Sequence, residues 1–292
     1  MQVRLFSALG ALVTVGGLTA WGIASPSGAA RQPTTQPPQI KFAAPIVNPL
    51  TVAHPPVLSA GWHQIFKGVF SGTRLNRSVW ATCYPWSDLP SGCTNSGNSN
   101  ELEWYLPAQD RVYKGALHLV AQRRPTAGQT SGGRPKQYPC RSGMITSFPK
   151  LRFKFGYVKV VARLASSYGL WSAVWLAAAN RQWPPEIDLI ETWGQPWVRA
   201  GVYFHPRGAK GAKTKLGPAE AASLDTGWHT FSLSWSYSKL VWFVDGRAVL
   251  IVQQHIPHQD MYLIANLADY ALTGTAGCSG RLLVRSVEVW QR

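Results

Sequence analysis

Three acidic residues fall close together in a chain that has few acids. The sequence contains 13 Asp and Glu among 292 residues, and Glu186, Asp188 and Glu191 share one short segment, PEIDLIETWG. Two carboxyl groups on one face can cleave a glycosidic bond with retention of configuration. One of them attacks the anomeric carbon, and the other protonates the leaving oxygen and later activates water. The cluster therefore predicts a site for retaining glycoside hydrolysis.

This spacing suits a β-strand only if the strand carries a bulge. Residues i and i+2 of a strand share a face, so Glu186 and Asp188 lie together, whereas Glu191 at i+5 would face the other way. One extra residue at Leu189–Ile190 restores the phase. Asp188 then lies between two like charges, where we expect it to keep one neighbour protonated and to orient the other by a hydrogen bond. The raised pKa is expected on Glu191, with Glu186 ionised at neutral pH.

Two other interpretations of the cluster are a solvated acidic strand and a calcium site. The apolar residues Ile187, Leu189 and Ile190, with Trp183 and Trp193 on either side, favour a buried strand over a solvated one. We therefore prefer the catalytic interpretation.

Short alternating apolar segments recur from Trp62 onward between clusters of Gly, Pro and Asn. They lie at residues 116–120, 156–164, 231–235, 240–244 and 282–290. Strands at such spacing, with no convincing amphipathic helix between them, indicate an all-β sandwich or barrel. The dipeptide Asp245-Gly246 predicts a two-residue hairpin turn, because Asp-Gly favours the positive φ angles that match strand twist.

The N-terminal residues predict export. Residues 1–30 contain Arg4, an apolar stretch and then small residues, which is typical of a secretory signal, and an uncleaved membrane anchor is the alternative. Residues 31–56 are rich in Pro and Thr and are predicted to form a semi-rigid linker. We expect one catalytic domain over residues 57–292 in a secreted protein, which stays attached to the envelope if the signal is not cleaved.

Four cysteines fit an exported protein, and none of them has the spacing of metal ligands. They allow three pairings. Cys83 and Cys93 bracket a turn rich in Pro, Gly and Asn and are close enough to staple it, which would leave Cys140 with Cys278.

The charge balance is strongly basic, with 29 Lys and Arg against 13 acids and a formal net charge of +16. An exported protein meets no nucleic acid as its ordinary substrate, so the charge points to an acidic glycan or an anionic cell surface. General solubility and adhesion are an equal alternative. The segment after His205 carries Arg207, Lys210, Lys213 and Lys215, which could lie at the edge of a cleft or on an ordinary solvated loop.

The sequence resembles glycoside hydrolase family 16, the group of laminarinases, lichenases, agarases and carrageenases. The pattern Glu-x-Asp-x-x-Glu matches the bulged form of the family motif. Further segments similar to the family are Ser142–Ser147, Gly169–Leu176, Trp242–Gly246 and Tyr262–Leu267. The resemblance implies a β-sandwich jelly roll of two curved antiparallel sheets with a concave substrate cleft. It also implies that Glu186 is the nucleophile, Asp188 the assisting acid and Glu191 the acid/base.

Two charged positions depart from the family pattern. Lys159 stands where the family usually has an acid, and Glu288 stands where it usually has an arginine. The charge pair between the two strands could therefore simply be reversed.

The resemblance also indicates which side chains would contact sugar. The candidates are Trp171, Trp175, Trp193, His205, Asn100 and Glu101. Aromatic faces stack well on pyranose rings, although core packing is the alternative for each tryptophan. The family histidine lines the cleft beside the acid/base, and the Asn-Glu pair belongs to a segment that reaches the glycone side, with turn capping as its alternative.

By the resemblance the leading substrate is a β-1,3-glucan, and an anionic glycan is the alternative that the charge suggests. We expect no cofactor, no nucleic-acid partner and a monomer. A structural calcium ion is common in the family, but no acidic cluster is left to bind it. A lectin-like glycan-binding module and a transglycosylase are the competing functions. The intact carboxylate motif argues against the first, whereas the sequence does not separate the second from hydrolysis.

Overall fold

The computed structural model describes residues 53–59, 61–87, 92–95, 100–130, 132–194, 198–216, 224, 226–270 and 277–292. The predicted signal and residues 31–52 of the predicted linker lie outside this part of the chain. All described strands belong to the unit Val47–Arg292. Among the described residues, no helix has both the length and the apolar character needed to cross a membrane.

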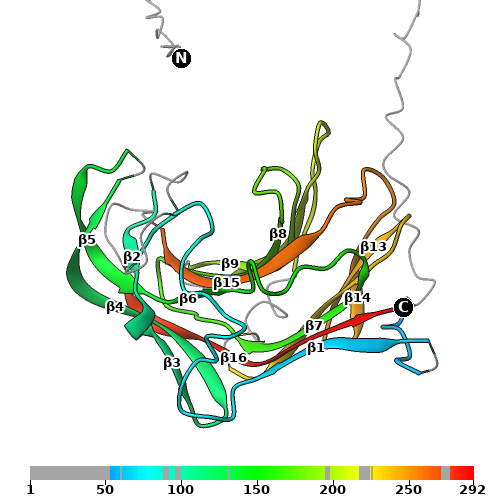
Figure 1. Ribbon diagram of the computed structural model, residues 1–292, viewed down its shortest axis with the longest axis horizontal. Coiled ribbons are helices and arrows are strands. Elements are labelled where there is room, and N and C mark those ends of the chain that lie inside the picture. Colours follow the sequence, from blue (N-terminus) through cyan, green and yellow to red (C-terminus); the bar gives the residue numbers. More distant parts are fainter. Residues whose placement is uncertain are drawn as a thin grey trace, which may run out of the picture. The chain divides into compact units, whose positions relative to one another are not determined.

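Two β-sheets pack face to face in the described chain, and Figure 1 shows both of them curved. The ten-stranded sheet runs in the order β14 (Arg247–Val252), β13 (Leu240–Val244), β12 (His229–Trp235), β7 (Gly156–Arg163), β16 (Ser279–Gln291), β4 (Ala116–Gln129), β5 (Pro135–Ser142) and β2 (Glu103–Tyr105), with β1 (His63–Val69) beside β16 and β3 (Asp110–Tyr113) beside β4. The six-stranded sheet runs in the order β11 (Ala212–Lys215), β10 (Val198–His205), β9 (Glu186–Gly194), β8 (Leu170–Ala178), β15 (Met261–Asp269) and β6 (Met144–Thr146). The predicted all-β jelly roll is confirmed.

The five segments predicted as strands are present as β4, β7, β12, β13 and β16. All strand pairs are antiparallel except β2 with β5, which run parallel. The expectation of purely antiparallel sheets is wrong at this edge. Parallel neighbours need a long connection, and here β3 and β4 lie between the two strands in the sequence.

The core between the sheets follows from the alternation of side chains. In β7, Val158, Val160 and Ala162 are fully buried, whereas Lys159 and Arg163 are not. These residues belong to the same apolar cluster as Ile187, Leu189 and Ile190 of β9. Because burying one such aliphatic side chain contributes about 1.5–3 kcal/mol, this packing fixes which face of β9 points outward.

The turn between β13 and β14 has the two residues that the sequence predicted. Asp245 and Gly246 have φ angles of 48° and 79°, so both adopt the left-handed region. The Asp245 carboxylate accepts a hydrogen bond from the backbone N of Thr230 at 2.8 Å and lies 2.7 Å from Nδ1 of His229. The turn is therefore tied to the neighbouring strand β12.

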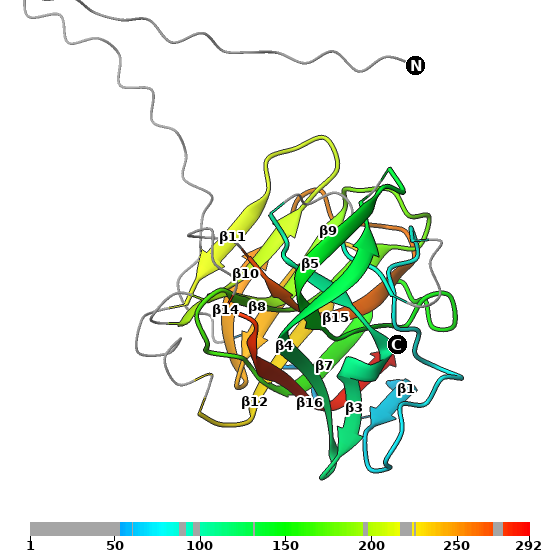
Figure 2. The same ribbon diagram turned by 90° about the vertical axis from the view of Figure 1, so that its left-hand side faces the viewer.

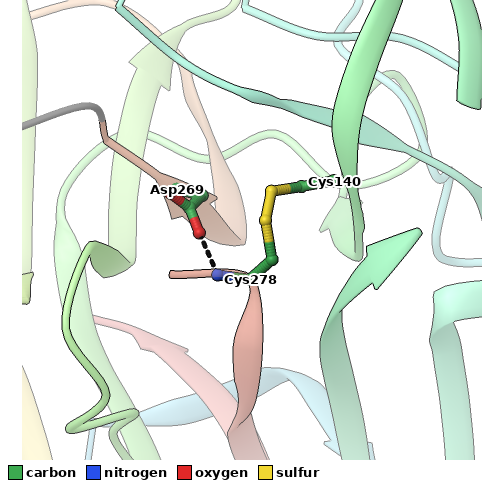
Figure 3. Close-up of side chains that lie close together, drawn as sticks. All are labelled: Cys140, Asp269 and Cys278. Carbon is green, nitrogen blue, oxygen red and sulfur yellow. Dashed lines mark hydrogen bonds between the residues drawn. A yellow bond between two sulfur atoms is a disulfide. The ribbon is translucent and has the colours of Figure 1, made fainter. Parts of the chain in front are cut away.

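Both predicted disulfides are present, Cys83–Cys93 and Cys140–Cys278. Figure 3 shows the second one beside Asp269, whose carboxylate accepts a hydrogen bond from the backbone N of Cys278. The same carboxylate accepts a second bond from the backbone N of Gly277 at 3.2 Å. This group joins β5, the end of β15 and the start of β16. Since the two sulfur atoms are bonded to each other, the group is not a metal site.

The reversed charge pair suggested by the sequence is also present. Nζ of Lys159 lies 2.8 Å from Oε2 of Glu288, and the two residues are direct neighbours on β7 and β16. The same ammonium group lies 5.2 Å from the ring centroid of Trp290. The departure from the family pattern at Lys159 is therefore matched by the acidic residue at position 288.

Candidate active site

The bulge in β9 lies where the sequence predicted it. On one side Ile190 pairs with Val174 and Asp188 pairs with Trp175, so Leu189 is the extra residue. On the other side the register also shifts between Gly201 and Tyr203 of β10. Leu189 and Ile190 are both buried in the core, which returns the residue after them to the outer face.

As a result, the three carboxylates open onto one pocket on the outer face of the six-stranded sheet. Its lining consists of Tyr84, Asn95, Glu101, Trp171, Ala173, Trp175, Glu186, Asp188, Glu191 and Asn266. The other lining residues come from β8, from β15 and from loops on that side of β9, so the pocket runs across the strands from β9 toward β15. Figure 1 shows this sheet curving away from the larger one, with β2, β4 and β5 rising on one side.

Glu191 accepts a hydrogen bond from Nε1 of Trp171 at 3.1 Å. Burial and, to a smaller extent, the charge of Glu186 raise the pKa of Glu191 to about 8, against the opposing effect of the bond from Trp171. A carboxyl group in this environment is mostly protonated at neutral pH, which suits a proton donor.

Glu186 has its own indole donor, Nε1 of Trp183, at 3.1 Å from Oε2. Burial raises the pKa of Glu186 to about 7, and the bond from Trp183 opposes this shift. The expected order, with Glu191 above Glu186, is found. The expectation of a fully ionised Glu186 is not met, because a group with a pKa of about 7 is about half protonated at pH 7.

Trp183 corrects one part of the sequence analysis. It was expected to flank a buried strand, but it precedes β9 and its side chain is 68% exposed. Its ring lies 5.9 Å from that of His205. Trp183 therefore forms a solvent-facing wall beside Glu186 and does not contribute to the core.

Asp188 is almost completely buried between the two glutamates. Burial raises the pKa of Asp188 well above its usual value, and the charges of Glu186 and Glu191 raise it further. Among the described residues no group donates a hydrogen bond to its Oδ2. Its backbone O accepts a bond at 2.8 Å from Nε1 of Trp242, which reaches across the sandwich from β13. The strand is thus held from behind, and the three carboxyl groups cannot all be ionised together.

Residues 103–273, more than half of the chain, match the model of the glycosyl hydrolases family 16. The chain belongs to glycosyl hydrolase family 16. An endo-1,3-1,4-beta-glycanase of Rhizobium meliloti is 28% identical to it over 226 residues, which cover 72% of this chain and 47% of the relative. The glucan endo-1,3-beta-glucosidase A1 of Niallia circulans is 27% identical over 201 residues, which cover 64% of this chain and 29% of that protein. The chain therefore spans about half or less of the length of these relatives.

Solved structures show the same fold. The X-ray structure of an endo-beta-1,3-glucanase from Pyrococcus furiosus has a TM-score of 0.67 to this family 16 chain, with 21% sequence identity. The matched region covers 79% of this chain and 94% of the other. At this identity the comparison describes the sandwich itself.

The remaining predicted residues fall into three groups in this family 16 site. Trp171, Trp175 and Glu101 line the pocket as expected. Asn100 is exposed and donates from Nδ2 to the Tyr270 hydroxyl at 3.1 Å, so it lies beside the pocket and not in its lining. Trp193 pairs with Arg199 in the backbone register, and its side chain lies outside the described residues.

His205 lies at the end of β10, directly opposite Glu186 in the register, and not beside Glu191 as the resemblance implied. Its Nε2 is 3.6 Å from Oε1 of Glu186 and 3.8 Å from Oδ2 of Asp188. Burial lowers the pKa of His205, and the charge of Lys213 lowers it further, which favours the neutral imidazole. The sequence predicted no metal here, yet one ligand atom from each of these three residues lies within 4.8 Å of the others, a set that could hold a cation.

A buried polar chain behind the pocket was not found by sequence reasoning. Trp175 donates from Nε1 to Oδ1 of Asn266 at 2.8 Å, and Nδ2 of Asn266 lies 3.2 Å from the Tyr105 hydroxyl. Tyr84 packs against this group and stacks on Trp86 with 4.5 Å between ring centroids. The one available signal was an amide side chain inside the apolar run MYLIANL, where a polar group needs a partner.

Proposed function

We propose that this chain is a retaining endo-glycoside hydrolase with Glu186 as nucleophile and Glu191 as acid/base. The observation that carries the proposal is the pair of glutamates on one bulged strand, facing one pocket, each with its own indole donor. Glu191 has the higher pKa of the two, as a proton donor beside a nucleophile requires.

In the first step the ionised Glu186 carboxylate attacks the anomeric carbon and forms a covalent ester. The bond from that carbon to the leaving oxygen breaks, and Glu191 transfers its proton to this oxygen. The charge of Glu186 is consumed in the ester, so its contribution to the raised pKa of Glu191 disappears. The Glu191 carboxylate can then take a proton from water, which attacks the same carbon and releases Glu186.

Asp188 adjusts this cycle without reacting. It is buried between the two glutamates, and it carries a raised pKa because of burial and of both neighbours. A proton on Asp188 reduces the repulsion that ionised Glu186 would otherwise meet. His205, kept neutral by burial, can approach Glu186 without neutralising its charge.

The proposed substrate is a β-linked polysaccharide, with β-1,3-glucan as the leading backbone. The names of two relatives refer to β-1,3 bonds in glucans or glycans, which supports this choice. The pocket runs from β9 across β8 and β15 toward Glu101, which suits a polysaccharide chain bound across the strands.

We further propose that the protein is exported. The apolar N-terminal stretch with small residues after it supports this, and so do two disulfides, which persist in oxidising compartments. Mass spectrometry of the protein made through its native route should find a chain that lacks about the first 30 residues and has no free thiol. A full-length chain with four free thiols would contradict export.

Release of reducing ends from a panel of β-glucans tests the proposed activity. Wild type should release oligosaccharides from laminarin, and proton NMR should detect the β-anomer first. Glu186→Gln should be inactive on every polymer of the panel. An α-anomer as first product, or activity in the Glu186→Gln variant, would contradict the assignment.

A further inference from the structure

Lys213 of the edge strand β11 faces the same side of the sheet as the catalytic carboxylates. Directly paired residues on antiparallel strands point to the same face. Asp188 pairs with Tyr203, and Tyr203 pairs with Lys213. These three residues therefore form one row across β9, β10 and β11 on the pocket side. The charge of Lys213 also lowers the pKa of His205, so it acts on the same region.

Lys215 completes a second row. Glu191 pairs with Gly201, and Gly201 pairs with Lys215. Burial along β11 agrees with this orientation, because both lysines are exposed whereas Ala212 and Leu216 pack against the core. Gly201 itself has no side chain, and the ring and hydroxyl of Tyr203 occupy the space over it, between Glu191 and Lys215. Neighbouring strands lie about 4.8 Å apart, so β11 is about 10 Å from β9, within the span of a bound polysaccharide.

The hairpin that joins β10 to β11 adds two more basic residues, Arg207 and Lys210, both exposed. Figure 2 shows this hairpin extending beyond the end of the sheet. Arg207 donates from Nη2 to Oε1 of Gln182 at 2.9 Å, which ties it to the turn before β9. Arg181 on that turn donates from Nη1 to the backbone O of Pro85 at 3.4 Å.

We call Arg207, Lys210, Lys213 and Lys215 the basic edge. Within the part of the chain that the structure describes, no acidic side chain forms an ion pair with any of its members. The carboxylates of β9 that share its face are the buried Glu186, Asp188 and Glu191, whose pKa values are all raised. The basic edge therefore presents positive charge that the pocket does not neutralise.

We propose that the basic edge binds the anionic substituents of a β-linked polysaccharide, on the side of the cleavage point opposite to Glu101. This inference rests on the proposed function and specifies its substrate class as a glycan with carboxylate or sulfate groups. Glu101 is bridged to Tyr270, just past β15, so it marks the other end of the path across the sheet. A polymer that lies over β9 and leaves the pocket over β10 passes Lys213 and Lys215. At physiological salt, screening acts over about 8 Å, so charges this near the path can still select the substrate.

The test compares kcat/KM on laminarin with that on carboxymethylated and on sulfated laminarin of the same length, at low and high salt. For wild type, the ratio of anionic to neutral activity should be above one at low salt and fall about tenfold at high salt. In the double variant Lys213→Gln/Lys215→Gln, this ratio should be about tenfold lower than in wild type at low salt. The two modified polymers distinguish a site for carboxylates from one for sulfates.

The matched control is Lys67→Gln/Lys239→Gln, which removes one exposed lysine from β1 and one from the turn between β12 and β13. It has the same net charge as the first variant and should keep the wild-type ratio. A second variant, Lys213→Arg/Lys215→Arg, should also keep it and shows that the backbone tolerates change there. Equal ratios in all variants, or parallel salt curves for neutral and anionic polymers, would overturn the inference while leaving the hydrolase intact. No cleavage of any polymer by wild type would instead refute the proposed function.

Discussion

At the scale of single residues, Glu186 and Glu191 accept hydrogen bonds from different tryptophan side chains. Trp171 donates to Glu191 from within the pocket lining, and Trp183 donates to Glu186 from an exposed position. Each bond lowers the pKa of its own glutamate against the effect of burial. The two indoles therefore adjust the pKa values of the two glutamates separately.

This difference predicts a pH profile with separable limbs. Because the first step needs Glu186 ionised and Glu191 protonated, kcat/KM should rise as pH passes about 7 and fall as it passes about 8. Trp171→Phe removes a bond that lowers the pKa of Glu191, so the alkaline limb should move to higher pH. Trp183→Phe should move the acid limb to higher pH for the same reason. If both variants move the same limb, the assignment of acid and nucleophile is wrong.

The three carboxyl groups should also differ in the effect of replacement by an amide. Glu186→Gln and Glu191→Gln each remove a reacting group and should lower kcat by about 10³-fold or more. Asp188→Asn keeps the shape and should lose about tenfold. Burial gives all three groups a folded-state pKa above the unfolded one, so the stability of wild type falls as pH rises through these values. Thermal unfolding at pH 9 should therefore show each amide variant at least as stable as wild type, and a lower melting temperature for all three would contradict the raised pKa values.

The type and spacing of residues predicted the three carboxylates, and the family resemblance indicated Glu101, but neither predicted every contact around them. Trp183 was misassigned because its orientation depends on the turn before β9 and not on strand alternation. Asn266 and Tyr105 meet only through tertiary packing, since they are 161 positions apart in the sequence. Long-range contacts of this kind leave no local pattern that a single sequence could show.

At the scale of elements, the site depends on how the second sheet supports the bulge in β9. Trp242 of β13 reaches through the core and donates to the backbone O of Asp188. Contacts from both sheets thus fix the register of β9. Because its apolar residues face the core, the carboxylates must face outward. The bulge and the Asp245-Gly246 turn could be predicted, because each follows from the preferences of a few consecutive residues.

We predict that Trp242→Phe weakens both folding and catalysis. It removes a buried hydrogen bond and leaves a cavity, so the free energy of unfolding should fall by about 2–3 kcal/mol in urea titration. Trp235→Phe is the control, since Trp235 also donates a buried hydrogen bond, but to the backbone O of Pro257 at 3.1 Å and not to β9. Both variants should lose stability, and only Trp242→Phe should lower kcat at temperatures where both are folded. Equal kcat values would show that the bond does not position Asp188.

At the scale of the whole molecule, two disulfides hold segments at very different separations. Cys83–Cys93 spans 10 residues, and Cys140–Cys278 spans 138. The longer loop removes more conformational freedom from the unfolded chain. The second disulfide also connects β5 to the start of β16, the strand that follows β15 in the sequence.

Replacing each pair by serines should separate their contributions. Loss of Cys140–Cys278 should lower the free energy of unfolding by about 4–5 kcal/mol, and loss of Cys83–Cys93 by about 3 kcal/mol. Urea titration of the two double variants measures both values. A larger loss for the short loop would contradict the loop-entropy explanation.

The central claim is that Glu186 forms the bond to the anomeric carbon, and azide rescue tests it most directly. The Glu186→Ala variant should be inactive on an aryl β-glucan oligosaccharide, because the attacking group is missing. Azide can enter the vacated space and attack the same carbon once, so the account predicts an α-glycosyl azide, detectable by NMR. The matched variant Glu191→Ala should instead give the β-glycosyl azide, since Glu186 still forms the ester that azide then displaces. A β-azide from Glu186→Ala, or no azide product from it while Glu191→Ala yields one, would contradict the assignment of Glu186 as nucleophile.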